Sequence, residues 1–418
     1  MINSISLRLR QGAITVLITS VLFGGIEIGL RLFVDASWIG GVYMFHPTYL
    51  IQPRPNAQSS FQRTVTNGGP TIASRTNKWG FRGKDFERET DEIRVMVYGD
   101  SNIEARFSTY ENTFAGRLEA ELEARTGHSY QVINAGVAGF GPDQTLLKVA
   151  DEIPVWNPDL VIVHIFADND YGDILRNRLL YIDDETGKIV NRGIPLIEKF
   201  ISYTRELYAL KAIKKIIYAT LSKTGKAIGV TLQKPNRRRP AGEPALDRHS
   251  RRIGEEYKAY FNRSLPRSIG DHYDLDIALD PDSDSGRIKI KLMKETLGRI
   301  FLFVKIENNV PIIFLIQPST KDISTNSKLN YQKLETISEK YRRDNLVKPI
   351  ESVLDRLNAD YVNLFDSFVT SGRTPYYFAV GDNHWNDAGQ ALAAKLMAER
   401  LVGNYGTAPV QKEENGPS

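Results

Sequence analysis

Five short apolar segments, separated by helical patterns, constrain the fold of this chain more than any other feature. The predicted strands are Ile93–Tyr98, Tyr130–Asn134, Asp159–Phe166, Val310–Gln317 and Tyr361–Leu364. Apolar residues at helical spacing predict helices over 113–125, 145–152, 288–308, 331–357 and 386–401. Strands that alternate with helices pair in parallel, and the helices then cover both faces of the sheet. The sequence therefore predicts an α/β fold with a parallel sheet.

One long insertion interrupts this alternation at about 171–290, where the sequence shows no clear pattern of a buried strand. Within it, 205–239 is strongly basic and 201–221 has the spacing of an amphipathic helix, while 235–290 looks rich in loops. Two interpretations remain open for the basic segment. It contacts anionic lipid headgroups, or it is a solvated helix that packs on the domain and ends in a charged loop.

The N-terminus carries a targeting signal. An apolar stretch at 12–34, interrupted by Glu27 and Arg31, is long enough to cross a bilayer. These two residues stand one helical turn apart and can pair near the outer interface. Because Arg8 and Arg10 lie on the short flank, residues 1–11 are expected in the cytoplasm and the body of the chain outside.

Two other interpretations of this stretch remain. It is a signal peptide cleaved near Val34-Asp35-Ala36, or a buried N-terminal helix of a soluble protein. After it, 35–90 is rich in prolines and polar residues and is expected to be an extended connector, docked to the core through Trp79 and Phe81. The main domain is expected over 91–403, followed by a disordered tail at 404–418.

Composition excludes some kinds of chemistry. The 418 residues contain no cysteine, so disulfides, thiolate metal sites and cysteine nucleophiles are ruled out. The formal net charge of +4 is too small to imply a nucleic-acid partner.

The strongest chemical signal is a serine and a histidine far apart in the sequence. Ser101 follows Gly99-Asp100 at the end of the first predicted strand, and ligands of open α/β sheets gather at such ends. A serine hydroxyl needs a base to act as a nucleophile at neutral pH, and the base needs an acceptor that orients it. His384, in a polar turn before the last helix, is the candidate base, and Asp382 is the candidate acceptor.

Two further strand ends offer hydrogen-bond donors. Gly136 follows the second strand, where its amide could face a developing oxyanion, and the side-chain amide of Asn169 follows the third. Each segment is equally compatible with an ordinary turn. His164 lies inside the third strand and is expected to be a packed, hydrogen-bonded histidine without a catalytic role.

These blocks, in this order, resemble the SGNH subgroup of the GDSL-type esterases and lipases. The resemblance covers roughly 93–170 and 310–403, and it implies a three-layer α/β/α sandwich. It also implies that Ser101 is the nucleophile and His384 the base. The Ser101 amide, the Gly136 amide and the Asn169 side chain would form the oxyanion hole.

The segment Asn77-Lys78-Trp79-Gly80-Phe81-Arg82-Gly83 resembles membrane-anchored bacterial members of this group. Two departures from the family pattern stand out. Ala167 replaces the glycine that usually opens the third block, and Asp382 lies two residues before the histidine instead of three, where Gly381 stands. Asp-x-His-Trp resembles polysaccharide O-acetyltransferases related to this fold.

The sequence thus predicts a serine esterase or acyl hydrolase of the bacterial inner membrane, with its catalytic domain on the periplasmic or extracellular side. The expected substrate is an acylated small molecule, lipid or glycan, and no metal, cofactor or nucleic acid is expected. Three alternatives are an O-acyltransferase of a cell-envelope or exported polysaccharide, a metal-dependent phosphoesterase, and an inactive envelope scaffold.

Overall fold

The computed structural model describes most of the chain. The described residues are 2–34, 39, 41–62, 69–87, 89, 91–183, 185–227, 244–262, 272–325, 329–370, 376–378 and 383–406. Contacts divide the chain into two compact units. One comprises Met1–Ala57 and Ile194–Ala241, here called the anchor unit. The other comprises Gln58–Gly193 and Gly242–Ser418, here called the sheet unit.

The sheet unit is built on five parallel strands in the order β11-β10-β7-β5-β6. They are β5 (Ile93–Tyr98), β6 (Tyr130–Asn134), β7 (Leu160–Ala167), β10 (Ile312–Pro318) and β11 (Asp360–Asn363). After β5 the chain adds β6 on one side and then β7 on the other, so the topological switch point lies at β5. Ligands of open α/β sheets bind outside the carboxyl ends of strands at such a point.

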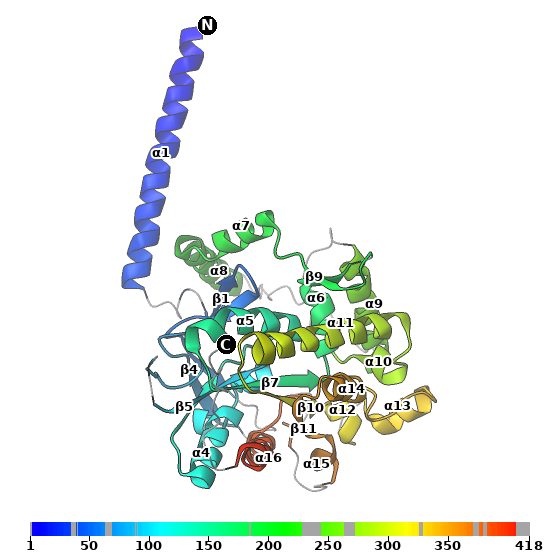
Figure 1. Ribbon diagram of the computed structural model, residues 1–418. Coiled ribbons are helices and arrows are strands. Elements are labelled where there is room, and N and C mark those ends of the chain that lie inside the picture. The colour runs from blue at the N-terminus through cyan, green and yellow to red at the C-terminus, as the bar shows by residue number, and fades with distance from the viewer. Residues whose placement is uncertain are drawn as a thin grey trace. The chain divides into compact units, whose positions relative to one another are not determined.

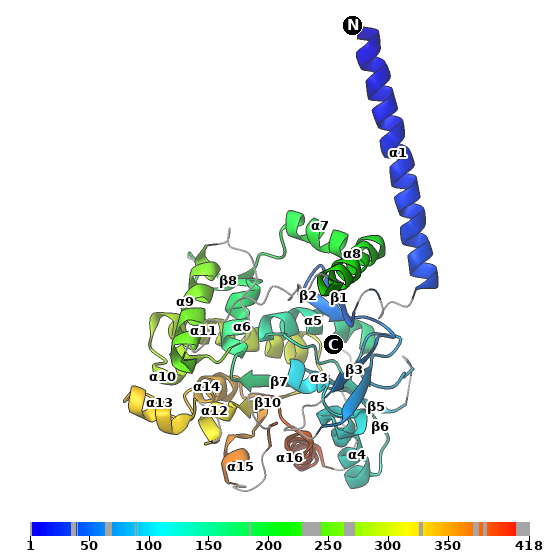
Figure 2. The ribbon, with the colours of Figure 1, turned by 180° about the vertical axis from the view of Figure 1, so that it is seen from behind.

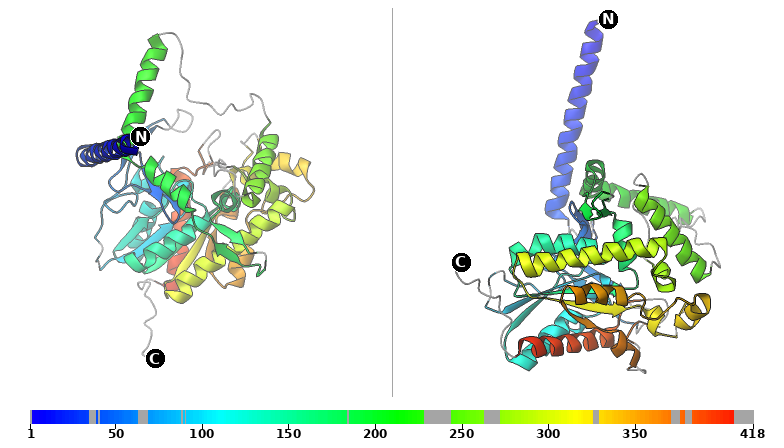
Figure 3. Two further views of the ribbon diagram at one scale, coloured as in Figure 1. Left: turned by 90° about the horizontal axis from the view of Figure 1, so that it is seen from above. Right: turned by 45° about the vertical axis from the view of Figure 1, so that its right-hand side comes forward.

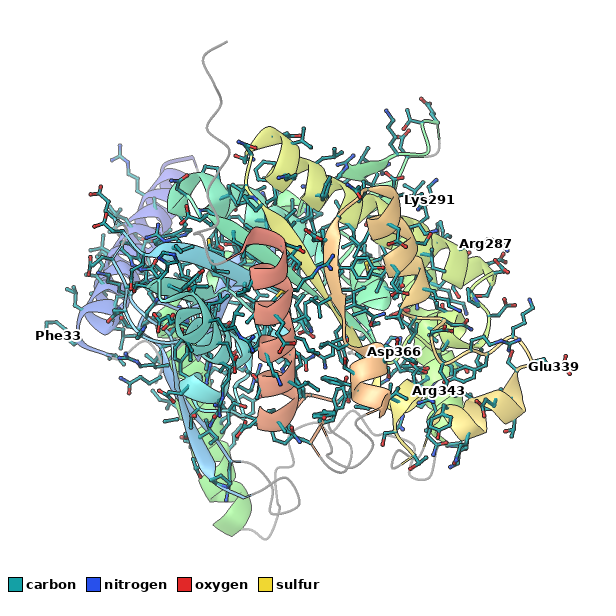
Figure 4. All side chains as sticks on the ribbon, turned by 60° about the horizontal axis from the view of Figure 1, so that its bottom comes forward. Phe33, Arg287, Lys291, Glu339, Arg343 and Asp366 are labelled. Carbon is teal, nitrogen blue, oxygen red and sulfur yellow. The ribbon has the colours of Figure 1, made fainter. Side chains whose placement is uncertain are left out.

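Helices cover both faces of this sheet (Figure 1). Successive side chains of a strand point to opposite faces, so Val95 and Val97 enter one apolar core while Met96 and Tyr98 enter the other. The first core is closed by α4 (Phe114–Thr126) and α16 (Asp387–Tyr405), and Figure 4 looks onto this face with α16 in red. The second is closed by α5 (Pro142–Trp156), α6 (Asp170–Asn177), α11 (Asp284–Phe301) and α14 (Lys348–Arg356). The predicted three-layer α/β/α fold is confirmed.

Side-chain caps set where the helices next to the sheet begin. The Thr113 hydroxyl accepts a hydrogen bond from the Gly116 amide and starts α4. The Asn386 side chain accepts hydrogen bonds from the amides of Ala388 and Gly389, and so starts α16. Smaller elements of the sheet unit are α3 (Ser101–Glu104), a 3₁₀ turn (Tyr110–Asn112), α12 (Thr320–Ile323) and α15 (Phe365–Thr370).

Several elements differ from the sequence prediction. The helix expected over 331–357 is two helices, α13 (Tyr331–Ile337) and α14, and the one expected over 288–308 begins as α11 and continues as a π-helix (Leu302–Glu307). The region expected to be rich in loops contains α9 (Ala245–Phe261) and α10 (Leu275–Leu279). The prediction missed α9 because most of its side chains are polar and only a narrow stripe of it is buried. A short hairpin, β8 (Leu180–Ile182) and β9 (Ile189–Asn191), also lies in the insertion.

The predicted connector contains two hairpins, one in each unit. Strands β1 (Tyr43–His46) and β2 (Leu50–Pro53) belong to the anchor unit, and β3 (Gln58–Gln62) and β4 (Thr71–Arg75) to the sheet unit. Further along, the rings of Trp79 and Phe81 lie edge-on to Trp156 at centroid distances of 5.2 and 5.3 Å. These contacts attach the end of the connector to the core of the sheet unit.

The described residues of the anchor unit also form long helices. Helix α1 (Ile2–Phe33) is the long helix that begins near the N-terminus (Figure 2). Its apolar segment, Arg10–Phe33, is long and apolar enough to cross a membrane. The amphipathic helix expected over 201–221 is two helices, α7 (Leu196–Arg205) and α8 (Tyr208–Ala227). Residues 228–243, which include the arginine cluster of the basic segment, lie outside the described residues.

Candidate active site

Ser101 lies at the carboxyl end of β5, at the switch point of the sheet. It is the first residue of α3, and the Asp100 carboxylate caps this short helix by accepting a hydrogen bond from the Asn102 amide at 2.8 Å. The turn before it is crowded, since a Cβ on Gly99 would lie 2.6 Å from Ile103 Cγ1 and 3.0 Å from His164 Cβ. Glycine at this position therefore allows α3 to pack directly onto the sheet.

The structure brings Ser101 and His384 into contact. His384 Nε2 lies 2.7 Å from Ser101 Oγ, although the two residues are 283 positions apart in sequence. Both side chains are half-buried. This is hydrogen-bond distance, at which an imidazole can take the proton of a hydroxyl that attacks an electrophile.

Two hydrogen bonds join Asn102 and Trp385, the residues that directly follow Ser101 and His384 in the sequence. The Trp385 amide donates to Asn102 Oδ1 at 3.3 Å, and the Trp385 indole Nε1 donates to the Asn102 carbonyl at 2.9 Å. Both side chains are almost completely buried. The residue after the serine is thus bonded twice to the residue after the histidine, which fixes the separation of the two segments.

Asn102 is itself held by a buried polar network. Its Nδ2 donates to Asp100 Oδ2 at 3.2 Å, and its Oδ1 accepts from Gln317 Nε2 at 3.2 Å. Gln317 Oε1 lies 2.8 Å from His164 Nε2. Burial lowers the pKa of His164, although Asp100 and Gln317 act in the opposite direction. His164 is therefore a neutral histidine inside the network and does not touch Ser101 Oγ through any described contact.

A second buried carboxylate holds the turn that carries His384. Asn383 Nδ2 donates to Asp168 Oδ2 at 3.0 Å, and Lys321 Nζ lies 2.7 Å from Asp168 Oδ1. Burial opposes ionisation of Asp168, but the Lys321 ammonium and a hydrogen bond from Ser319 hold its pKa below the usual value. Asp168 is therefore a charged anchor for the histidine turn.

Gly136 lies beneath α3. A Cβ at this position would lie 2.4 Å from the Glu104 amide nitrogen, so only glycine allows the turn after β6 to pack there. The Gly136 amide donates to Asn134 Oδ1 at 3.1 Å, and Asn134 Nδ2 donates to the Ile103 carbonyl at 2.6 Å. The predicted oxyanion donor is thus engaged with Asn134 in this structure.

Asn169 is the residue before α6, and its side chain is nearly enclosed. Its Nδ2 donates to Asp173 Oδ2 at 2.9 Å, which uses one of the two amide hydrogens. Asp173 in turn pairs with Arg176, and Arg176 with the buried Glu256 at 3.1 Å. This charge network sets the orientation of the Asn169 amide.

Asp382, the predicted partner of His384, and Gly381 lie outside the described residues. The sequence analysis assigned no positioning role to five residues that hold the pair in place: Asn102, Gln317, Asp168, Lys321 and Asn383. For two of them a signal was present. Gln317 ends a predicted apolar strand, and Asp168 directly precedes Asn169, so both stand at carboxyl ends of parallel strands.

An apolar wall of aromatic rings stands beside the pair. The Phe107 ring lies edge-on to His384 at a centroid distance of 5.8 Å. Phe61 and Phe378 each lie edge-on to Phe107 at 6.0 Å. These rings would favour an apolar group of a bound molecule next to the histidine.

Asp322 directly follows Lys321 in the sequence. It is buried and accepts hydrogen bonds from the hydroxyls of Tyr273 and Tyr341 at 2.7 and 2.8 Å. Burial raises the pKa of Asp322 to about 7, although both hydroxyls lower it.

Within the described ranges, no three His, Asp or Glu side chains are grouped as a metal site requires.

The ends of β5, β6 and β7 and the turn before α16 therefore meet at one edge of the sheet, with β5 between β7 and β6. The sheet unit is thus an α/β domain with a parallel sheet and with the candidate site at the carboxyl ends of its strands. Its serine and histidine come from the first and last blocks, and the two remaining blocks lie beside them.

No family model and no curated protein matches the chain. Among solved structures, a lipase/acylhydrolase from Enterococcus faecalis matches with 11% identity and a TM-score of 0.36, over 74% of this chain and 96% of that chain. A catalytic mutant of an acetylxylan esterase from Geobacillus stearothermophilus matches with 10% identity and a TM-score of 0.36, over 78% and 100%. At these values the likeness says nothing about the chemistry of the site.

Proposed function

We propose that this protein is a membrane-anchored serine esterase that cleaves an O-acyl ester. The observation that carries the proposal is the 2.7 Å separation of Ser101 Oγ and His384 Nε2 at the carboxyl edge of the sheet. Ser101 Oγ attacks the ester carbonyl while His384 takes its proton, and His384 then returns the proton to the departing alcohol. Water, activated by the same imidazole, releases the acyl group from Ser101.

The tetrahedral intermediate carries a negative oxygen that needs donors. The proposed donors are the Ser101 amide, the Asn169 side chain and the Gly136 amide, each contributing on the order of 3 kcal/mol. The side-chain amide nitrogen of Asn169 has two hydrogens, so it can donate to Asp173 and to the oxyanion at once. The Gly136 amide would have to share its hydrogen between Asn134 and the oxyanion. We assign the orientation of His384 to Asp382.

Fluorophosphonate labelling tests the nucleophile and the base. Wild type is expected to be labelled, whereas Ser101→Ala is not labelled and His384→Ala is labelled at least about 100-fold more slowly. Ser129→Ala and His128→Ala are matched controls, because both residues are exposed at the amino end of β6, away from the site. Undiminished labelling of Ser101→Ala would refute the assignment. Ester hydrolysis that survives in this variant but is abolished by a chelator would favour a metal-dependent phosphoesterase-like site.

The same pair could transfer the acyl group to a sugar hydroxyl instead of water. The Asp382-x-His384-Trp385 spacing favours this second candidate, an O-acyltransferase of a cell-envelope or exported polysaccharide. Deacylation of labelled acyl-enzyme should be compared with and without a glycan acceptor. Faster release together with acylated glycan supports transfer, and an unchanged rate with free acid as the product supports hydrolysis.

We further propose that α1 anchors the protein in the bacterial inner membrane, with residues 1–11 in the cytoplasm and the sheet unit outside. The length and hydropathy of Arg10–Phe33 support this. Intact mass measurement of protein from alkali-washed membranes tests it. Retention of α1 in the mature chain is expected, and a chain that begins after Ala36 would refute it.

A further inference from the structure

Helix α8 is bonded directly to α1 within the anchor unit. The Glu27 carboxylate accepts hydrogen bonds from the amides of Tyr208 and Ala209 at 3.1 and 2.8 Å, which are the first amides of α8. Arg31 Nε pairs with Glu27 at 2.7 Å, and its guanidinium lies 4.7 Å from the centre of the Tyr208 ring. A carboxylate at a helix N-terminus satisfies amides that have no intrahelical partner. The start of α8 is therefore attached to one point on α1.

Helices α7 and α8 expose an unusual amount of apolar surface. On α8 the exposed apolar side chains include a row at helical spacing, and on α7 they occupy most of one side. Their exposed fractions lie between 41% and 83%, and they are Leu196, Ile197, Phe200, Ile201, Tyr203, Leu210, Ile213, Ile216, Ile217, Tyr218 and Leu221. A cluster of this size marks an interaction site.

The attachment point sets the depth of this surface relative to the bilayer. The apolar segment Arg10–Phe33 has 24 residues, which corresponds to about 36 Å of helix against about 30 Å of hydrocarbon. Glu27 lies six residues before Phe33, about 9 Å from the end of that segment. The first turn of α8 is thereby placed at the outer edge of the hydrocarbon layer. The left view of Figure 3 looks almost along α1, and α8 extends across that direction.

The polar residues of these helices fit a lipid surface. Arg205 and Lys214 are exposed, and Lys211 is paired with Glu206 at 2.8 Å. Long basic side chains can reach headgroup phosphates while their stems cover apolar surface. Tyr203 and Tyr218 are residues of the type enriched at membrane interfaces.

We propose that α7 and α8 lie in the outer interface of the same bilayer that α1 crosses. Their apolar side chains contact the acyl-chain boundary, and their basic side chains contact anionic headgroups. The first turn of α8 is bonded to Glu27 of the helix that is proposed to cross the membrane, which selects lipid as the occupant of this surface. The inference rests on the proposed anchoring by α1, and it adds that the Glu27 contacts keep α1 and α8 together in the mature protein.

Because the chain has no cysteine, single cysteines can be introduced into the full-length protein and labelled with an environment-sensitive fluorophore. The test sites are Phe200→Cys on α7 and Ile217→Cys on α8. Ile337→Cys, on an exposed position of the sheet unit, is the matched aqueous control, and Ile18→Cys in α1 is the lipid control. Each protein is reconstituted into vesicles of phosphatidylethanolamine and phosphatidylglycerol.

The expected result is quenching of the α7 and α8 labels by shallow spin-labelled lipid, with several-fold protection from aqueous iodide relative to Ile337→Cys. Iodide access equal to that of Ile337→Cys, with Ile18→Cys still quenched by lipid, would overturn the interfacial placement and leave the anchor intact. Protection in native membranes but not in pure lipid vesicles would also overturn it and would indicate a protein partner. Absence of lipid quenching at Ile18→Cys would instead overturn the anchor itself.

Discussion

Replacement of Asn102 by alanine tests whether the network behind the candidate active site positions Ser101 and His384. Asn102→Ala removes the acceptor for the Trp385 amide and for Gln317 Nε2, and the donor to Asp100. The bond from the Trp385 indole to the Asn102 carbonyl remains, because it uses the main chain. The segment that carries His384 should therefore stay near α3, but the distance between His384 and Ser101 should no longer be fixed.

These contacts set the expected losses of folding stability and of kcat in Asn102→Ala. The three lost hydrogen bonds are 3.2–3.3 Å long, which places each at the weak end of the range. Two buried donors are left without their acceptor, so the free energy of unfolding should fall by about 2–4 kcal/mol. A displacement of the reacting atoms by about 1 Å can reduce kcat roughly 100-fold, so a loss of about 10- to 100-fold is expected with little change in KM.

The assay is hydrolysis of a short-chain aryl ester, with chemical denaturation of the same samples. Leu292→Ala is the matched control, because Leu292 is fully buried in the core on the face covered by α11, and its truncation should cost about 2–5 kcal/mol. This control should lose stability and keep its kcat. If Asn102→Ala also keeps its wild-type kcat, or if both variants lose activity in proportion to stability, the positioning role is wrong.

Three further variants are informative. Gly136→Ala forces a Cβ to within 2.4 Å of the Glu104 amide, so denaturation should show a loss of about 1–3 kcal/mol, and probe labelling of Ser101 should slow. Asn383→Ala releases the histidine turn from Asp168 and should lower kcat about 10-fold at unchanged KM in the ester assay. Because the pKa of Asp322 is raised from 3.8 to about 7, its protonated form stabilises the fold at low pH, and this stabilisation is lost as the pH rises towards 7. Unfolding titrations of wild type and Asp322→Asn should therefore diverge between pH 4 and 7, by at most about 4 kcal/mol in favour of the variant, and parallel curves would contradict the raised pKa.

The strands next to the site could be predicted because their signal is local. The β5 and β6 strands are buried on both faces, so a run of apolar residues marks them with the bounds that the structure has. Helix α9 has no such signal, since its buried stripe includes Glu256, which is held by ion pairs with Arg176 and Lys289. A charged residue that is buried because it pairs with residues far away in the sequence is predicted to be exposed, since its partners cannot be recognised from neighbouring residues.

The sequence by itself determined the fold class, the candidate serine and histidine, and the apolar helix at the N-terminus, because strand runs, strand-end residues and hydropathy are properties of neighbouring residues. Only the tertiary structure decided that Asn102 is bonded to Trp385 and that Asp168 holds Asn383. It also decided that Glu27 caps α8. These contacts join positions far apart in the chain, and such pairings depend on how the strands and helices pack, which no local pattern specifies.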